Sequence, residues 1–102
     1  MNITTVWLCS AIRAFIAILD RCSAETTFVE DCRLYADDLA AANKWLARLD
    51  AGEPPDEIAS EILAPATAKQ FTDYWRQGVW GDMESTALKT LQDTIRRQLH
   101  VP

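Results

Sequence analysis

The sequence has very few of the residues on which common catalytic and metal sites are built. Its 102 residues include one histidine, His100, and three glycines. Hydrolytic zinc sites need paired histidines, and a serine or cysteine nucleophile needs a histidine base. Phosphate-binding loops are rich in glycine, whereas Gly52, Gly78 and Gly81 are accounted for as helix stops and a turn. These shortages predict a protein with no enzymatic activity, no bound metal and no cofactor.

A disulfide framework and a membrane span are also not expected. Cys9, Cys22 and Cys32 are odd in number and form no Cys-x-x-Cys pair, so reduced thiols in a cytoplasmic protein are predicted. The apolar stretch 6–19 is shorter than the roughly 20 residues that a membrane helix needs. Arg13 also interrupts it. We therefore expect a cytoplasmic protein with a buried first helix and no membrane partner.

Apolar residues are abundant and follow helical spacing. They make up 49% of the chain, and no segment alternates with a period of two. The length fits one domain, residues 1–102. The prediction is an all-α, compact five-helix bundle with three long and two short helices. The expected helices span residues 5–22, 24–51, 55–63, 66–77 and 83–99.

The first predicted helix is apolar around most of its circumference. Its polar remainder is a thin line of residues, namely Ser10, Arg13, Ala17 and Asp20. A helix of this kind is either central in its own bundle or covered by a partner. A homodimer formed through residues 5–22 is therefore a further expectation.

The second predicted helix carries an unbroken apolar seam. Its members follow at alternating spacings of four and three, a pattern that predicts coiled-coil-like packing against an antiparallel neighbour in the same chain. On the helical wheel Asp37 and Asp38 lie beside this seam rather than inside it, and Trp45 lies near its edge. The seam consists of Phe28, Cys32, Tyr35, Leu39, Ala42, Leu46 and Leu49.

Negative charge dominates the chain. Fifteen Asp and Glu against ten Lys and Arg give a net charge of −5, which disfavours nucleic acid as a partner and favours a basic protein surface. Two clusters, one on helix 24–51 and one around helix 55–63, are predicted to form the binding face, with an ordinary solvated surface as the alternative. A magnesium-dependent nucleotide hydrolase is the enzymatic alternative. The predicted electrostatic residues are Glu30, Asp31, Asp37, Asp38, Asp56, Glu57 and Glu61.

The turn before the last predicted helix is rich in aromatic residues. Trp80 lies between Val79 and Gly81, where burial is not assured, and Tyr74 and Arg76 precede it. Tryptophan, tyrosine and arginine are enriched at interface anchors. We therefore predict that Tyr74, Arg76 and Trp80 anchor a partner protein. The alternative is that Trp80 closes the open end of the bundle.

Helix 5–22 and the start of helix 24–51 resemble the colicin D type of immunity protein. The resemblance covers about a quarter of the chain, and the overall character is similar to that of phage anti-CRISPR proteins. Both classes imply a stoichiometric inhibitor that covers a basic surface of a nuclease or nucleic-acid-binding complex. The matching residues are Phe15-Ile16-Ala17, Ser23-Ala24-Glu25, Phe28-Val29-Glu30 and Arg33-Leu34-Tyr35.

Residues 56–77 resemble a helix-turn-helix, and this resemblance gives the alternative function, a DNA-binding regulator. It rests on residues 58–62 followed by residues 65–68. In such a motif Thr67, Lys69 and Gln70 would face the major groove. The acidic residues of helix 55–63 argue against close approach to phosphate, and Pro65 stands where the motif usually has glycine.

Overall fold

The computed structural model describes residues 3–25, 29–65, 67 and 81–100. All regular structure in this part of the chain is helical, so the predicted all-α class and compact bundle are confirmed. Four helices are described, and the predicted helix 66–77 falls almost wholly outside the described residues. The helices are α1 (Thr5–Glu25), α2 (Val29–Asp50), α3 (Pro55–Leu63) and α5 (Gly81–His100).

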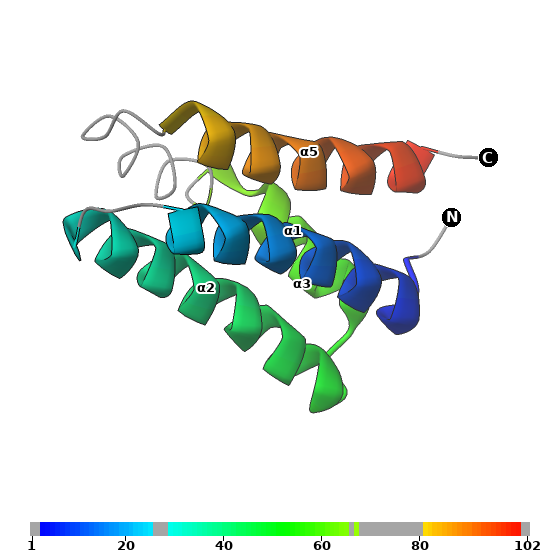
Figure 1. Ribbon diagram of the computed structural model, residues 1–102. Coiled ribbons are helices and arrows are strands. Elements are labelled where there is room, and N and C mark those ends of the chain that lie inside the picture. Colours follow the sequence, from blue (N-terminus) through cyan, green and yellow to red (C-terminus); the bar gives the residue numbers. More distant parts are fainter. Residues whose placement is uncertain (1–2, 26–28, 66, 68–80, 101–102) are drawn as a thin grey trace.

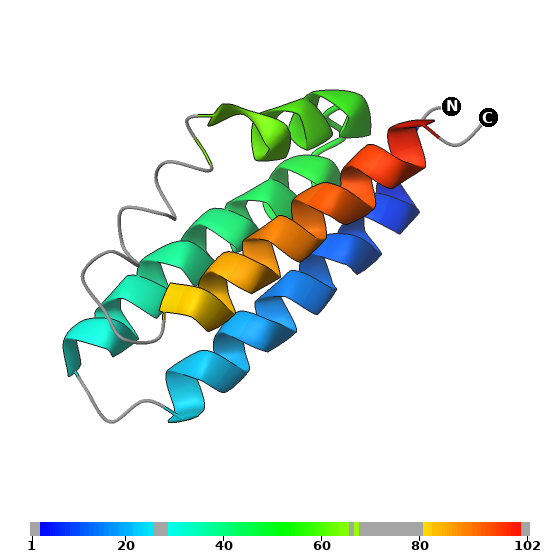
Figure 2. The same ribbon diagram turned by 90° about the horizontal axis from the view of Figure 1, so that it is seen from above.

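Helix α1 occupies the middle of the bundle (Figure 1). It packs most extensively on α2 and α5, and α3 lies behind, in contact with the other three helices. Seen from above, α1 runs antiparallel to both α2 and α5, so that the start of α1 and the end of α5 share one end of the bundle (Figure 2). The central position of α1 agrees with its nearly continuous apolar surface.

Helix α1 begins at a side-chain cap and buries one face completely. The hydroxyl of Thr4 accepts a hydrogen bond from the backbone N–H of Trp7 at 3.1 Å and so caps the helix. The predicted polar line is exposed, and Val6 also faces solvent. The apolar surface that motivated a homodimer is thus largely covered within the chain, and the homodimer stays a prediction. The buried α1 residues are Leu8, Cys9, Ile12, Phe15 and Leu19.

The junction of α1 and α2 differs from its prediction. Ser23, a preferred N-cap residue, directly precedes the expected helix 24–51, but α1 continues through Ser23 to Glu25 and α2 begins at Val29. A serine cap contributes only about 1 kcal/mol, and the sequence around Ser23 holds no glycine or proline to stop a helix already packed in the core. A preferred cap residue can therefore lie inside a helix.

The seam of α2 is rotated from its predicted position. Tyr35, Ala42 and Leu49 are buried as expected, whereas Leu39 and Leu46 are only partly buried. The second row of the buried face consists instead of Asp38 and Trp45. The spacing of four and three is preserved, but its second row lies one residue earlier. Trp45 is therefore a core residue, with its ring centroid 6.5 Å from that of Phe15.

The last helix buries a row of apolar side chains. Leu88, Leu91 and Ile95 are buried, and Leu99 is partly buried. The helix begins at Gly81, two residues before the predicted start, so Asp82 lies within the first turn rather than before it. No helix in the described part of the chain is long and apolar enough to cross a membrane.

Candidate functional site

The junction of α2 and α3 gathers five carboxylates, which we call the acidic corner: Asp50, Glu53, Asp56, Glu57 and Glu61. Its backbone is fixed by a glycine turn. Gly52 adopts a positive φ of 93°, which ordinary residues rarely adopt. The N–H of Gly52 donates to the carbonyl of Leu49, and the N–H of Glu53 donates to that of Arg48, each at 3.1 Å. These two bonds are those of a Schellman motif, which satisfies the last carbonyls of α2.

Helix α3 starts directly after this turn. Pro55 takes the first helical position and Asp56 and Glu57 lie in the first turn, where the helix dipole favours negative charge. Ile58, Ala59 and Ile62 are buried on the inner face. The acidic side chains consequently point outward, and Asp56 and Glu57 are exposed.

Arg48 reaches across the turn and pairs with two members of the acidic corner. Its Nη2 lies 3.0 Å from Oε1 of Glu53, its Nε donates to both oxygens of the same carboxylate, and its Nη1 also bonds Glu61. The hydrogen bond from Arg48 holds the pKa of Glu53 below its ordinary value. The same bond, with that to Glu61, raises the pKa of Arg48. The guanidinium therefore fixes two carboxylates in one geometry.

The remaining carboxylates of the acidic corner are more open. Asp56 accepts a weak hydrogen bond from the backbone N–H of Ile3 at 3.3 Å, which ties the residues before α1 to α3. No described residue pairs with Asp50 or Glu57, and both are exposed. Five carboxylates against one guanidinium leave the acidic corner with a clear excess of negative charge.

The corner unites three of the predicted site residues: Asp56, Glu57 and Glu61. Asp37 is exposed but belongs to the other half of α2, about 20 Å along the helix from Asp50 at 1.5 Å per residue. The predicted single face running from helix 24–51 to helix 55–63 is therefore two separate regions. Sequence analysis also missed Arg48, which the spacing of five residues to Glu53 across a glycine turn could have indicated.

Asp38 contradicts its predicted role. It was expected beside the seam as part of the acidic face, but its side chain is 0% exposed and lies on the buried face of α2. It cannot contact a partner at the surface in this conformation. The error came from the choice of seam row, because a shift by one residue moves Leu39 outward and Asp38 inward.

Five other predicted site residues cannot be compared with the structure. The side chains of Glu30 and Asp31 and the whole of Tyr74, Arg76 and Trp80 lie outside the described residues. The second helix of the predicted helix-turn-helix is likewise not described, except for Thr67. Its hydroxyl donates to the carbonyl of Glu61 at 2.7 Å, so it serves the end of α3.

A half-open hollow of about 100 Å³ lies between α1 and α5. Its lining is mainly apolar and includes Phe15, Ile18 and Leu91. Thr94 also borders it, but the Thr94 hydroxyl donates to the carbonyl of Thr90 at 2.7 Å. The hollow thus offers packing surface and no charged group.

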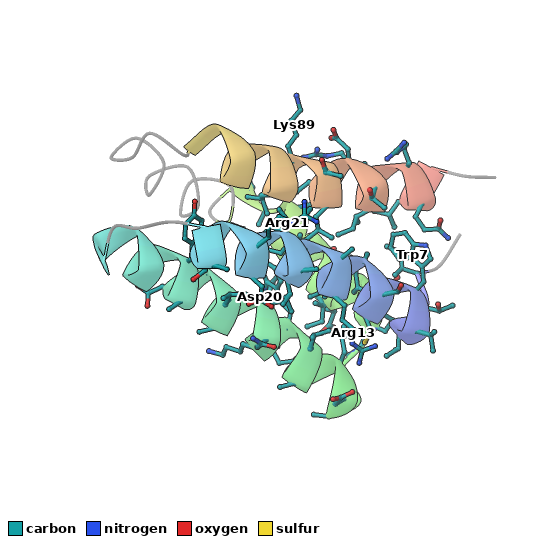
Figure 3. All side chains as sticks on the ribbon, in the orientation of Figure 1. Trp7, Arg13, Asp20, Arg21 and Lys89 are labelled. Carbon is teal, nitrogen blue, oxygen red and sulfur yellow. The ribbon has the colours of Figure 1, made fainter. Side chains whose placement is uncertain are left out.

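The basic side chains are spread over other parts of the surface. Lys89 points away from the bundle on α5, and Arg13 and Arg21 come from the exposed side of α1 (Figure 3). Arg96 pairs with Asp93 at 3.1 Å one turn earlier on α5. Among the described residues, no three His, Cys, Asp or Glu side chains are placed to hold a metal ion. In the comparisons with known proteins, no family model, curated protein or solved structure matches the chain.

Proposed function

We propose that the protein is a non-enzymatic binding module that docks its acidic corner on a basic surface of a partner protein. An inhibitor of a nuclease or of a nucleic-acid-binding complex would act in this way. The observation that carries the proposal is the convergence of five carboxylates at one helix junction, with only Arg48 to offset them. Such a concentration of charge steers association with a basic surface.

The rigidity of the acidic corner supports the same proposal. The Schellman turn at Gly52 fixes the backbone of the corner, and the bonds of Arg48 set the positions of Glu53 and Glu61 before a partner arrives. Ordering flexible side chains on binding weakens affinity, so a surface that is already ordered binds more tightly. Asp50 and Glu57 stay available for direct pairing with basic groups of the partner.

Charge reversal at the acidic corner tests the proposal. The double variant Asp50→Lys/Glu57→Lys changes two exposed carboxylates that no described residue pairs with. The matched control Asp20→Lys/Asp37→Lys changes the net charge by the same amount at exposed positions elsewhere. Affinity capture from host extract with the wild-type protein identifies the partner. Association rates are then measured with the purified pair at two salt concentrations.

The expected result is an association rate at least about tenfold lower for the corner variant, a smaller change for the control, and a wild-type rate that falls as salt is added. Equal rates for the two double variants would contradict the acidic corner as the docking surface. Magnesium-dependent turnover of nucleoside triphosphates that is lost in Asp37→Asn would contradict the non-enzymatic part.

A further inference from the structure

The most unusual group in the described interior is the carboxyl of Asp38. Its side chain is 0% exposed, and neither Oδ1 nor Oδ2 has a hydrogen-bond partner. Its neighbour in sequence, Asp37, lies about 100° further around the helix and is exposed. Buried polar groups are nearly always hydrogen-bonded, so an orphaned carboxyl needs an explanation.

No described charged group faces Asp38 from the elements packed around it. On α2 the same buried face carries Tyr35, Ala42 and Trp45. Among the described side chains of α1, the one buried titratable group is the thiol of Cys9, while Arg13, Asp20 and Arg21 are exposed.

The described side chains of the two remaining helices bury no countercharge either. The buried residues of α3 are apolar, and its acids Asp56, Glu57 and Glu61 are exposed. On α5 the buried polar residue is Gln92, whose amide is neutral and donates to the carbonyl of Ile62 at 2.9 Å. No described cation is therefore buried with Asp38, and no hydrogen-bond donor reaches its carboxyl oxygens.

Burial of an ionised carboxylate without a partner is costly, and such a group binds a proton instead. We propose that Asp38 makes the fold pH-responsive: the folded chain holds this carboxyl uncharged, and a rise in pH weakens the packing of α2 on α1. The proposal is independent of the acidic corner, which concerns the surface and the other end of α2.

The direction of the effect follows from proton linkage. In the unfolded chain an aspartate ionises near pH ~3.9. The folded chain keeps the proton to a higher pH, so unfolding releases one proton between these two points and stability falls as pH rises. The folding equilibrium constant then decreases by about tenfold per pH unit in that interval.

The carboxyl of Glu53, whose pKa is also shifted, has the opposite effect on how stability depends on pH. Arg48 lowers the pKa of Glu53, so its contribution to stability is present above the ordinary value of 4.5 and is lost as pH falls through the lowered value. Between about pH 5 and pH 7 Glu53 is ionised in both states. A loss of stability with rising pH in this range is thus separable from Glu53.

The test compares Asp38→Asn with the matched control Asp37→Asn, the same exchange one residue away at an exposed position. Urea unfolding is measured for the wild-type protein and both variants at pH 5, 6 and 7, which lie above the ordinary aspartate range. The ratio of folding constants, Asp38→Asn over wild type, should rise with pH by up to about tenfold per unit until Asp38 ionises in the folded chain. The ratio for Asp37→Asn should stay constant. A ratio for Asp38→Asn that does not change with pH would overturn the proposal.

A second measurement does not depend on the variant folding. Carbon-13 NMR of the wild-type protein, labelled at the aspartate carboxyl carbons, follows each ionisation directly. One aspartate resonance should keep the chemical shift of a protonated carboxyl above pH ~5, well past the ordinary aspartate range. If every aspartate of the folded protein has ionised by then, Asp38 is charged and the proposal fails.

Discussion

Two contacts in the bundle each bury one polar side chain, and only one of these side chains has a described hydrogen-bond partner. Where α3 meets α5, the amide of Gln92 donates to the carbonyl of Ile62, which lies at the end of α3 beyond the reach of regular helix bonds. Where α2 meets α1, Asp38 has no described partner. The first group is neutral and satisfied, whereas the second is ionisable and unsatisfied.

The difference separates a structural role from a pH-dependent one. Gln92 fixes the position of α3 at any pH, because neither its amide nor the carbonyl that it bonds titrates. Asp38 destabilises the folded chain by an amount that depends on its protonation. The apolar residues around Asp38 must offset this cost. Truncation of a side chain should therefore lower stability more at the α1–α2 contact than at the α3–α5 contact.

Truncation of the aromatic contact between α1 and α2 should have the largest effect. Phe15 is 2% exposed and lies against Trp45, so Phe15→Ala removes buried apolar surface and leaves a cavity. We expect a loss of about 3–5 kcal/mol in the free energy of unfolding. Val6→Ala is the control, because Val6 is 81% exposed on the same helix and should change stability by less than about 0.5 kcal/mol. Similar losses for both would show that Phe15 does not pack as the structure describes.

Removal of the satisfied amide should have a smaller effect that does not depend on pH. Gln92→Leu keeps the approximate shape but leaves the carbonyl of Ile62 without its donor. The expected loss is about 1–3 kcal/mol, measured by urea unfolding. The same loss should appear at pH 5 and at pH 7, values at which glutamine and leucine are both uncharged. A loss that grows with pH would mean that the two contacts do not differ in the way proposed.

The sequence was sufficient to predict the all-α class and the bounds of α3, but not the end of α1 or the rotation of α2. The correct predictions depend on repeated, local signals. Two seams that share the row Tyr35, Ala42 and Leu49 fit α2 almost equally well. They differ in the second row, and the leucines at 39 and 46 favoured the wrong one. Only packing on α1 selects the face, and it places Asp38 inside.

The acidic corner, too, could be predicted from the sequence only in part. The glycine and proline signals predicted where α2 ends and α3 begins, and the Gly52 turn confirms them. The ion pairs of Arg48 depend on how the turn folds α3 back toward α2, which spacing alone does not determine. The predicted aromatic anchor around Trp80 lies outside the described residues and stays a prediction.

Substitution of the turn glycine should have a moderate effect. Gly52 has a φ of 93°, and a Cβ added there would meet no atom within 4 Å. The cost of Gly52→Ala therefore comes from the backbone alone, and we expect a loss of about 1 kcal/mol. The matched control is Ala51→Gly, which changes the neighbouring residue and leaves Gly52 intact. A gain in stability for Gly52→Ala would contradict the described turn.

The ion pairs of Arg48 should contribute least, and with the opposite pH dependence to Asp38. Their side chains are 29% exposed in Arg48, 39% in Glu53 and 52% in Glu61, and pairs that reach solvent in this way add little to stability. In Arg48→Gln the pKa of Glu53 should return toward its ordinary value of 4.5, because the main cause of its lowering is removed. The small loss of stability should then be present at neutral pH and disappear in acid, where Glu53 is protonated in both states.

NMR titration of the glutamate carboxyl carbons measures this change, with Arg96→Gln as the control for an exposed pair elsewhere. An unchanged Glu53 titration in Arg48→Gln would show that the guanidinium does not hold this carboxylate in solution. With the expected result, the Arg48–Glu53 pair would make the folded protein less stable as pH falls. The buried carboxyl of Asp38 would make it less stable as pH rises. Stability would then be greatest in the mildly acidic range between these two effects.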